Sequence, residues 1–118
     1  MDLNIIEEQR ENNVTILKLE GELDVYTSPN LKEKIVTLIK TERPFVVLDL
    51  KGLSYMDSTG LGVMAAGLKR FRENGGNIVL VSPQKIIQKI LELTNMDVSL
   101  KIYQSYQEAI AKLAINED

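Results

Sequence analysis

Hydrophobic residues alternate between two spacings along the chain, and this alternation predicts an α/β fold. Short apolar runs rich in valine and leucine occupy residues 45–50 and 78–81, as is typical of strands buried on both faces of a parallel sheet. Weaker strand signals lie at residues 3–6, 14–19 and 100–103. Apolar positions three or four residues apart indicate the inner faces of helices, at residues 31–38, 61–71, 86–91 and 109–113.

The order of these elements is strand, strand, helix, followed by strand and helix in alternation. Alternation at this spacing favours parallel strands joined by right-handed crossovers, while the short turn at residues 11–13 favours an antiparallel strand at the N-terminal edge. The prediction is therefore an α/β fold, a mixed and mostly parallel sheet of about five strands packed with four helices. No linker or repeat interrupts the pattern, so residues 1–118 are predicted to form one domain.

Residues with known end preferences mark the predicted helix boundaries. Ser28-Pro29 and Ser82-Pro83 each offer a serine N-cap followed by a proline at the first helical position. Residues 74–76 and Asn95 tolerate the left-handed backbone that stops a helix. The third helix is expected to turn four apolar side chains inward: Ile86, Ile87, Ile90 and Leu91.

Composition narrows the function classes. The chain of 118 residues contains neither cysteine nor histidine, which removes thiolate chemistry, the commonest general base and the commonest metal ligand. Its net charge of -3 argues against nucleic-acid binding, which usually requires a basic stripe. The N-terminus shows no signal-peptide pattern and no apolar run reaches membrane-spanning length, so we expect a cytoplasmic protein that contacts no membrane.

A polar corner follows the apolar run at residues 45–50 and precedes the second predicted helix. It contains Asp57, Ser58, Thr59 and Gly60. A turn between a strand and a helix presents its functional atoms at the mouth of an α/β sheet. A helix N-cap needs one side-chain acceptor and this corner offers three, although a motif of this kind before an apolar helix usually serves only as a cap. Ser58 is the candidate functional residue, with capping as the structural alternative.

The common catalytic motifs do not match this corner. No glycine-rich loop ends in Gly-Lys-Ser/Thr, which excludes a P-loop. Ser58 lacks the first glycine of a hydrolase elbow and has no histidine to activate it. A receiver domain with a phosphoacceptor aspartate fits the length, but residues 20–24 lack the adjacent acidic pair that would hold magnesium. We therefore predict a protein that is not an enzyme, with a receiver-like domain as the alternative.

Two segments, residues 21–27 (GELDVYT) and residues 54–62 (SYMDSTGLG), resemble the STAS domain of bacterial anti-sigma factor antagonists. The resemblance is to the general stress-response and sporulation type, and it covers nearly the whole chain, including Gly75-Gly76 and residues 92–96. It implies a regulator whose unphosphorylated form binds an anti-sigma factor serine kinase and so releases a sigma factor. The kinase supplies the ATP and phosphorylates the serine that corresponds to Ser58, and a serine phosphatase reverses the reaction.

The resemblance also implies a set of functional residues. Phosphorylation is expected on Ser58, and no catalytic residue, cofactor or metal is expected. Because the two segments should end neighbouring strands, we expect one partner-binding corner formed by Asp24, Tyr26, Thr27, Asp57, Ser58, Thr59, Gly60 and Leu61. Alanine at Asp24 or Tyr26 should weaken partner binding without changing the melting temperature. The alternative within this family is a scaffold module of a transporter or stress-signalling complex that is never phosphorylated.

Overall fold

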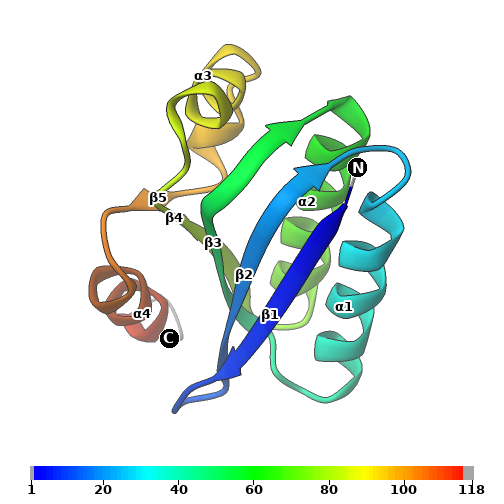
Figure 1. The fold of residues 1–118 in the computed structure, drawn as a ribbon. Helices are drawn as coiled ribbons and strands as arrows, with labels where there is room; N and C mark the ends of the chain where they lie inside the picture. The colour runs from blue at the N-terminus through cyan, green and yellow to red at the C-terminus, as the bar shows by residue number, and fades with distance from the viewer. Residues whose placement is uncertain (1, 116–118) are drawn as a thin grey trace.

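Five strands form one mixed sheet in the computed structural model, which describes residues 2–115 (Figure 1). Their order across the sheet is β1-β2-β3-β4-β5, with β1 antiparallel to β2 and the other neighbours parallel. The bounds are Leu3–Gln9 for β1, Val14–Leu23 for β2, Phe45–Met56 for β3, Asn77–Val81 for β4 and Ile102–Tyr103 for β5. The predicted α/β fold class is confirmed.

Four α-helices within the described residues cover the two faces of this sheet. Their bounds are Ser28–Lys40 for α1, Ser58–Glu73 for α2, Lys85–Leu93 for α3 and Tyr106–Ile115 for α4, with a short 3-10 helix at Met96–Val98. Side chains of α1, α2 and α3 share one core with the sheet, and α4 packs in a second core on the opposite face. The central strands are therefore buried on both faces, as their runs of valine and leucine predict.

Strands β2 and β3 are longer than their apolar runs. They were expected at residues 14–19 and 45–50, but they continue as a paired ladder to Leu23 and Met56. The register shifts twice in this extension, next to Gly21, whose backbone has the positive φ of +114°. Such irregularities break the alternation of inward and outward side chains, so the pattern no longer reads as a strand. Beyond Asp49 the extension of β3 pairs with β2 and not with β4.

The serine caps predicted for two helices are wrong. Thr27, not Ser28, occupies the N-cap position of α1, and Ser28 is its buried first residue. Ser82 has φ +54°, a left-handed conformation that an N-cap residue does not usually adopt, and α3 begins only at Lys85. Pro83 therefore precedes α3 rather than opening it.

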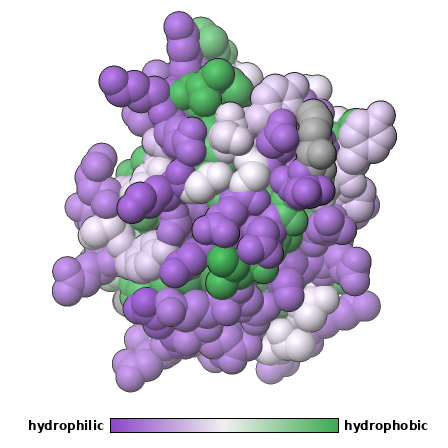
Figure 2. All heavy atoms as spheres, viewed as in Figure 1, coloured by the Kyte–Doolittle hydropathy of each residue, from purple (hydrophilic) through white to green (hydrophobic). Residues whose placement is uncertain are grey.

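The predicted helix stops are confirmed. Gly75 follows α2 with φ +78°, and Asn95 follows α3 with φ +59°. Ile87 and Leu91 are buried as expected, but Ile86 is 57% exposed because it lies on the outer side of α3. Figure 2 shows apolar side chains at the α3 end of a surface that is otherwise mostly hydrophilic in this view. Within residues 2–115, no helix combines the length and apolar character needed to cross a membrane.

Candidate functional site

The pairing of β2 with β3 brings the two predicted segments together. Leu23 and Met56, the last residues of these parallel strands, lie opposite each other in the register. The next residue of each strand is an aspartate, so Asp24 and Asp57 emerge side by side at the same edge of the sheet. Figure 1 shows the loop before α1 and the start of α2 at this common end. The prediction that the two segments meet at one corner is confirmed.

Asp57 connects the two sides of the corner. One carboxylate oxygen accepts a hydrogen bond of 2.9 Å from the backbone N–H of Gly60, which caps α2. The other accepts a hydrogen bond of 3.1 Å from the backbone N–H of Val25, in the loop before α1. The backbone N–H of Asp57 donates to the carbonyl oxygen of Leu23 at 3.2 Å. Asp57 is therefore the N-cap of α2 and also fixes the neighbouring loop.

Asp24 folds the loop between β2 and α1 around its own side chain. Its Oδ1 accepts hydrogen bonds of 2.9 Å from the backbone N–H groups of Tyr26 and Thr27. The Thr27 hydroxyl oxygen accepts from the Asp24 backbone N–H at 2.9 Å and lies 2.8 Å from the Glu22 carbonyl oxygen, to which it donates. Only 3% of Asp24 and 6% of Thr27 is exposed. These two residues therefore shape the loop from inside.

The burial of Asp24 and Thr27 corrects the expectation that their side chains face a partner. Gly60 is buried as well. The expectation that alanine at Asp24 leaves the melting temperature unchanged is also not supported, because a buried carboxylate that accepts backbone N–H groups stabilises the loop. Of the residues predicted to contact the partner, those with exposed side chains are Tyr26, Ser58 and Thr59.

The environment of Asp24 favours its charged form. Burial acts to raise the pKa of Asp24, but hydrogen bonds from the backbone N–H groups of Thr27 and Tyr26 outweigh it, so its pKa lies below the usual value. Its second oxygen, Oδ2, is buried and has no hydrogen-bond partner among residues 2–115. The carboxylate is thus held by one oxygen, and its charge contributes to the negative character of the corner.

The lowered pKa of Asp24 predicts how stability responds to acid. A group whose pKa is lower in the folded state than in the unfolded state stabilises the fold above the unfolded value, about 3.9 for aspartate. That contribution disappears as the pH falls through the folded value. We therefore expect Asp24→Asn to melt at a lower temperature than the wild type at neutral pH, with a difference that shrinks below about pH 4. A difference that stays constant down to the acid transition would contradict this account.

Ser58 is the first residue of α2, and its side chain is exposed. Because Asp57 caps the helix, Ser58 is not needed for capping, and its hydroxyl makes no hydrogen bond to any residue between 2 and 115. Thr59, the next residue, is exposed as well. The predicted position of Ser58, in the first turn of the second helix and at the surface, is confirmed.

Gly60 allows α2 to start against the end of β2. A Cβ atom at this position would lie 2.7 Å from the carbonyl oxygen of Leu23 and 2.8 Å from its Cγ. Only glycine therefore permits this approach without a shift of the helix or the strand. Leu61, the next residue, is half-buried and packs against the main core. Gly60 and Leu61 thus hold the start of α2, and with it Ser58, close to the end of β2.

Sequence reasoning missed two exposed side chains at this corner. Val25 is 54% exposed and Tyr55 is 45% exposed, beside Tyr26, which is 83% exposed. Both lie in the two predicted segments, but the sequence alone did not show which side chains in these segments point outward. The feature of the sequence that indicates their exposure is that both are large, largely apolar residues next to predicted turn residues. Both segments at this corner therefore carry exposed, largely apolar side chains in addition to the polar residues.

The described residues contain no group of three or more metal-ligating side chains that would hold an ion. The chain also has no histidine to activate Ser58 as a nucleophile. What the geometry does provide is an exposed hydroxyl at a helix N-terminus, two aspartates and exposed aromatic residues. This arrangement suits recognition by another protein better than catalysis by this chain.

Comparisons with known proteins agree with this interpretation. The family model of the STAS domain matches residues 6–109. An anti-sigma-B factor antagonist of Bacillus subtilis (strain 168) is 34% identical over 105 residues, which cover 86% of this chain and 94% of that protein. An anti-sigma F factor antagonist of Paenibacillus polymyxa is 29% identical, over 93% of this chain and 95% of that protein.

A solved structure shares the fold. A candidate anti-sigma factor antagonist from Thermotoga maritima superposes with a TM-score of 0.86 at 28% identity, covering 93% of this chain and 94% of that one. The named relatives are anti-sigma factor antagonists, which are regulatory binding proteins rather than enzymes. With the family model matching most of its length and a sheet of the same arrangement, the chain belongs to the STAS domain family.

Proposed function

We propose that this chain is an anti-sigma factor antagonist whose binding is controlled by phosphorylation of Ser58. In its unphosphorylated form it binds an anti-sigma factor that is itself a serine kinase, and the sigma factor is released. The kinase, which binds ATP, phosphorylates Ser58 and thereby ends the interaction, and a serine phosphatase restores the binding form. The observation that carries the proposal is the exposed Ser58 hydroxyl. It is not needed to cap α2, because Asp57 accepts the capping hydrogen bond.

A phosphate at Ser58 would change the surface more than the fold. It adds roughly -1.5 to -2 charge units at neutral pH. The N-terminus of α2 carries a partial positive charge and has backbone N–H groups in its first turn that lack partners within the helix, so it can accommodate an anion. The partner-facing side of the corner already holds Asp57 and, beneath it, Asp24. We therefore expect the added charge to weaken binding of a partner whose surface fits the neutral serine.

The proposed contact surface consists of the exposed residues Tyr26, Ser58 and Thr59, with Leu61 at its inner edge. Tyr26 is suited to this role, because an exposed aromatic side chain gains much contact area on binding. Asp24, Thr27, Asp57 and Gly60 support the surface by fixing the loop and the helix start. Val25 and Tyr55 are exposed in the same two segments and are candidates to extend this surface.

A phosphorylation assay with the cognate anti-sigma factor tests the proposal. Incubation with this kinase and Mg-ATP should add one phosphate to the wild type, and peptide mass spectrometry should locate it on Ser58. Ser58→Ala should remain unmodified, and the matched control Thr59→Ala should be modified normally. Tight binding of the kinase without any phosphate transfer would instead favour an unphosphorylated scaffold module. Phosphate on Thr59 alone would show that Thr59, and not Ser58, is the phosphorylated residue.

A further inference from the structure

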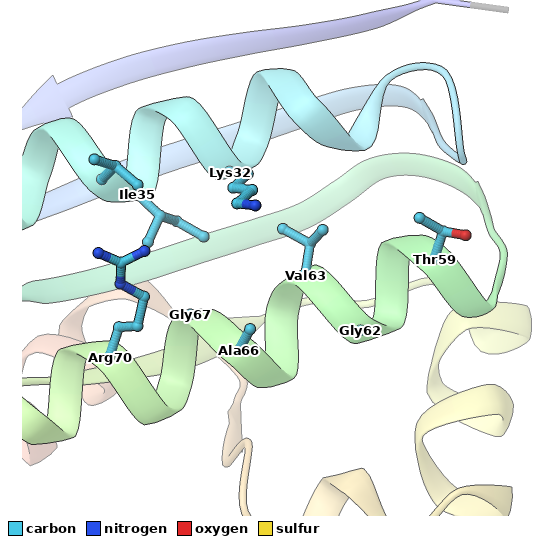
Figure 3. A pocket seen from close by; sticks show the side chains of 9 residues that line it. Lys32, Ile35, Thr59, Gly62, Val63, Ala66, Gly67 and Arg70 are labelled. Atoms are coloured by element: carbon cyan, nitrogen blue, oxygen red, sulfur yellow. The ribbon is translucent and has the colours of Figure 1, made fainter.

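A groove lies between α1 and α2 and begins next to the proposed contact surface (Figure 3). Its volume is about 210 Å³. Thr59 lies at one end and Arg70 at the other, with Lys32 and Val63 between them (Figure 3). The remaining lining residues are apolar or small: Ile35, Val36, Gly62, Ala66 and Gly67. The groove is therefore an apolar depression with two cationic side chains along it.

Two glycines of α2 explain why the groove exists. At Gly67 the helices are close, because a Cβ atom there would lie 2.8 Å from Cδ1 of Ile35. At Gly62, one and a half turns earlier, a Cβ atom would meet nothing within 4 Å. The helices thus touch at Gly67 and leave unfilled space at Gly62, where a larger residue would have fitted without strain. This space can be occupied by a side chain from outside.

The charges along the groove are of one sign. Lys32 and Arg70 are its two charged lining residues, and none of the lining residues is acidic. Neither cation forms a salt bridge with any residue between 2 and 115. This contrasts with the whole chain, whose net charge is -3. The groove is therefore complementary to a carboxylate, whereas the corner beside it carries the negative charges of Asp24 and Asp57.

We propose that this groove receives an apolar side chain flanked by a carboxylate, both from one segment of the anti-sigma factor. The apolar side chain fills the space over Gly62, and the carboxylate lies between Lys32 and Arg70. The inference rests on the proposed function, and it adds a second contact of the same partner. Continuity supports this occupant, because Thr59 lines the groove and directly follows Ser58 in the first turn of α2. A partner bound over Ser58 thus lies directly against the groove.

Filling the groove tests the apolar half of the proposal. Gly62→Leu should occupy the space and weaken binding to the cognate anti-sigma factor roughly tenfold to a hundredfold, the equivalent of one large aliphatic side chain kept out of its pocket. Gly62→Ala is the matched control, because it makes the same backbone change but leaves most of the space open, and it should bind within about twofold of the wild type. Gly62→Ala should fold, since nothing lies within 4 Å of the added Cβ. A thermal melt of Gly62→Leu separates loss of binding from loss of folding.

Reversing charges tests the acidic half. Lys32→Glu and Arg70→Glu should each weaken binding roughly tenfold, with a loss that diminishes at high salt. Lys89→Glu makes the same charge change on α3, away from the groove, and should have little effect. If all three variants weaken binding equally, the loss reflects the net charge of the chain, and the proposed carboxylate contact in the groove is wrong.

The outcomes separate this inference from the proposed function. If Ser58→Asp abolishes binding while Gly62→Leu binds normally, the switch stands and the groove contact is wrong. If neither variant affects binding, the proposed function is wrong as well. Sedimentation of the chain alone provides the third arm: self-association that Gly62→Leu disrupts would identify a second copy of this chain as the occupant and overturn the proposal.

Discussion

Ser58→Asp is expected to bind the cognate anti-sigma factor about 100-fold more weakly than the wild type, and Ser58→Ala within about threefold of it. The aspartate places a fixed negative charge next to Asp57 at the contact surface, and burying such a charge against a partner without a cation to pair it costs several kcal/mol. Ser58→Ala removes a hydroxyl that makes no hydrogen bond within the described residues, so the surface keeps its shape and charge. Titration by isothermal calorimetry or fluorescence anisotropy gives the three affinities.

Thermal melts of the same variants separate the switch from a folding defect. A negative charge in the first turn of a helix is favourable by about 0.3–1 kcal/mol, so Ser58→Asp should be at least as stable as the wild type. Ser58→Ala should be nearly neutral, because Asp57 keeps its capping hydrogen bond with Gly60. The switch would be refuted by equal affinities for all three proteins. Loss of binding in step with loss of folding would show instead that Ser58 is a structural residue.

Gly60→Ala and Gly62→Ala are expected to change stability in opposite directions, although they are the same substitution two residues apart in α2. At Gly60 the new methyl group meets the carbonyl oxygen of Leu23 at 2.7 Å, and overpacking of this kind costs about 1–3 kcal/mol. At Gly62 the methyl group meets nothing within 4 Å, and replacing glycine in a helix by alanine is favourable by about 0.4–1 kcal/mol.

Denaturant unfolding of both variants measures the difference directly. Because both variants replace glycine by alanine within α2, the difference between their free energies of unfolding mainly reports the contact between α2 and the end of β2. Gly60→Ala should also reduce partner binding, since the displaced helix start carries Ser58. If the two variants unfold at the same denaturant concentration, the close approach at Gly60 is not needed to position the helix.

The parts of the fold that sequence reasoning predicted are those set by local pattern. The runs at residues 45–50 and 78–81 contain valine and leucine without alternation, which identifies strands covered on both faces. The position of Ser58 at the edge of the sheet follows from chain order, because it lies between a strand and an amphipathic helix, whereas its role was predicted from the resemblance of its segment to the STAS domain. Neither prediction depends on a contact between distant residues.

The errors concern features that depend on distant contacts. Asp24 has the composition of a loop acid, and its burial follows from the register that brings it next to Asp57, thirty-three positions away. Ser82-Pro83 resembles a cap, but Ser82 lies where β4 ends and takes a left-handed conformation before α3 starts. Ile86 fits the helical period and is nevertheless exposed, because its direction depends on where α3 lies against β3.

The overhang of β2 and β3 beyond β4 has a consequence for how the surface can diverge. Residues Gly52–Met56 pair with β2 alone, and Ser54 and Tyr55 on this overhang are exposed. Their amide protons should exchange with solvent sooner than those of Val46–Leu48, which lie between two strands. Leu53 and Met56 on this overhang remain packed in the main core, whereas Tyr55 is 45% exposed. Selection can therefore change the exposed position to suit a new partner while the buried positions stay constant.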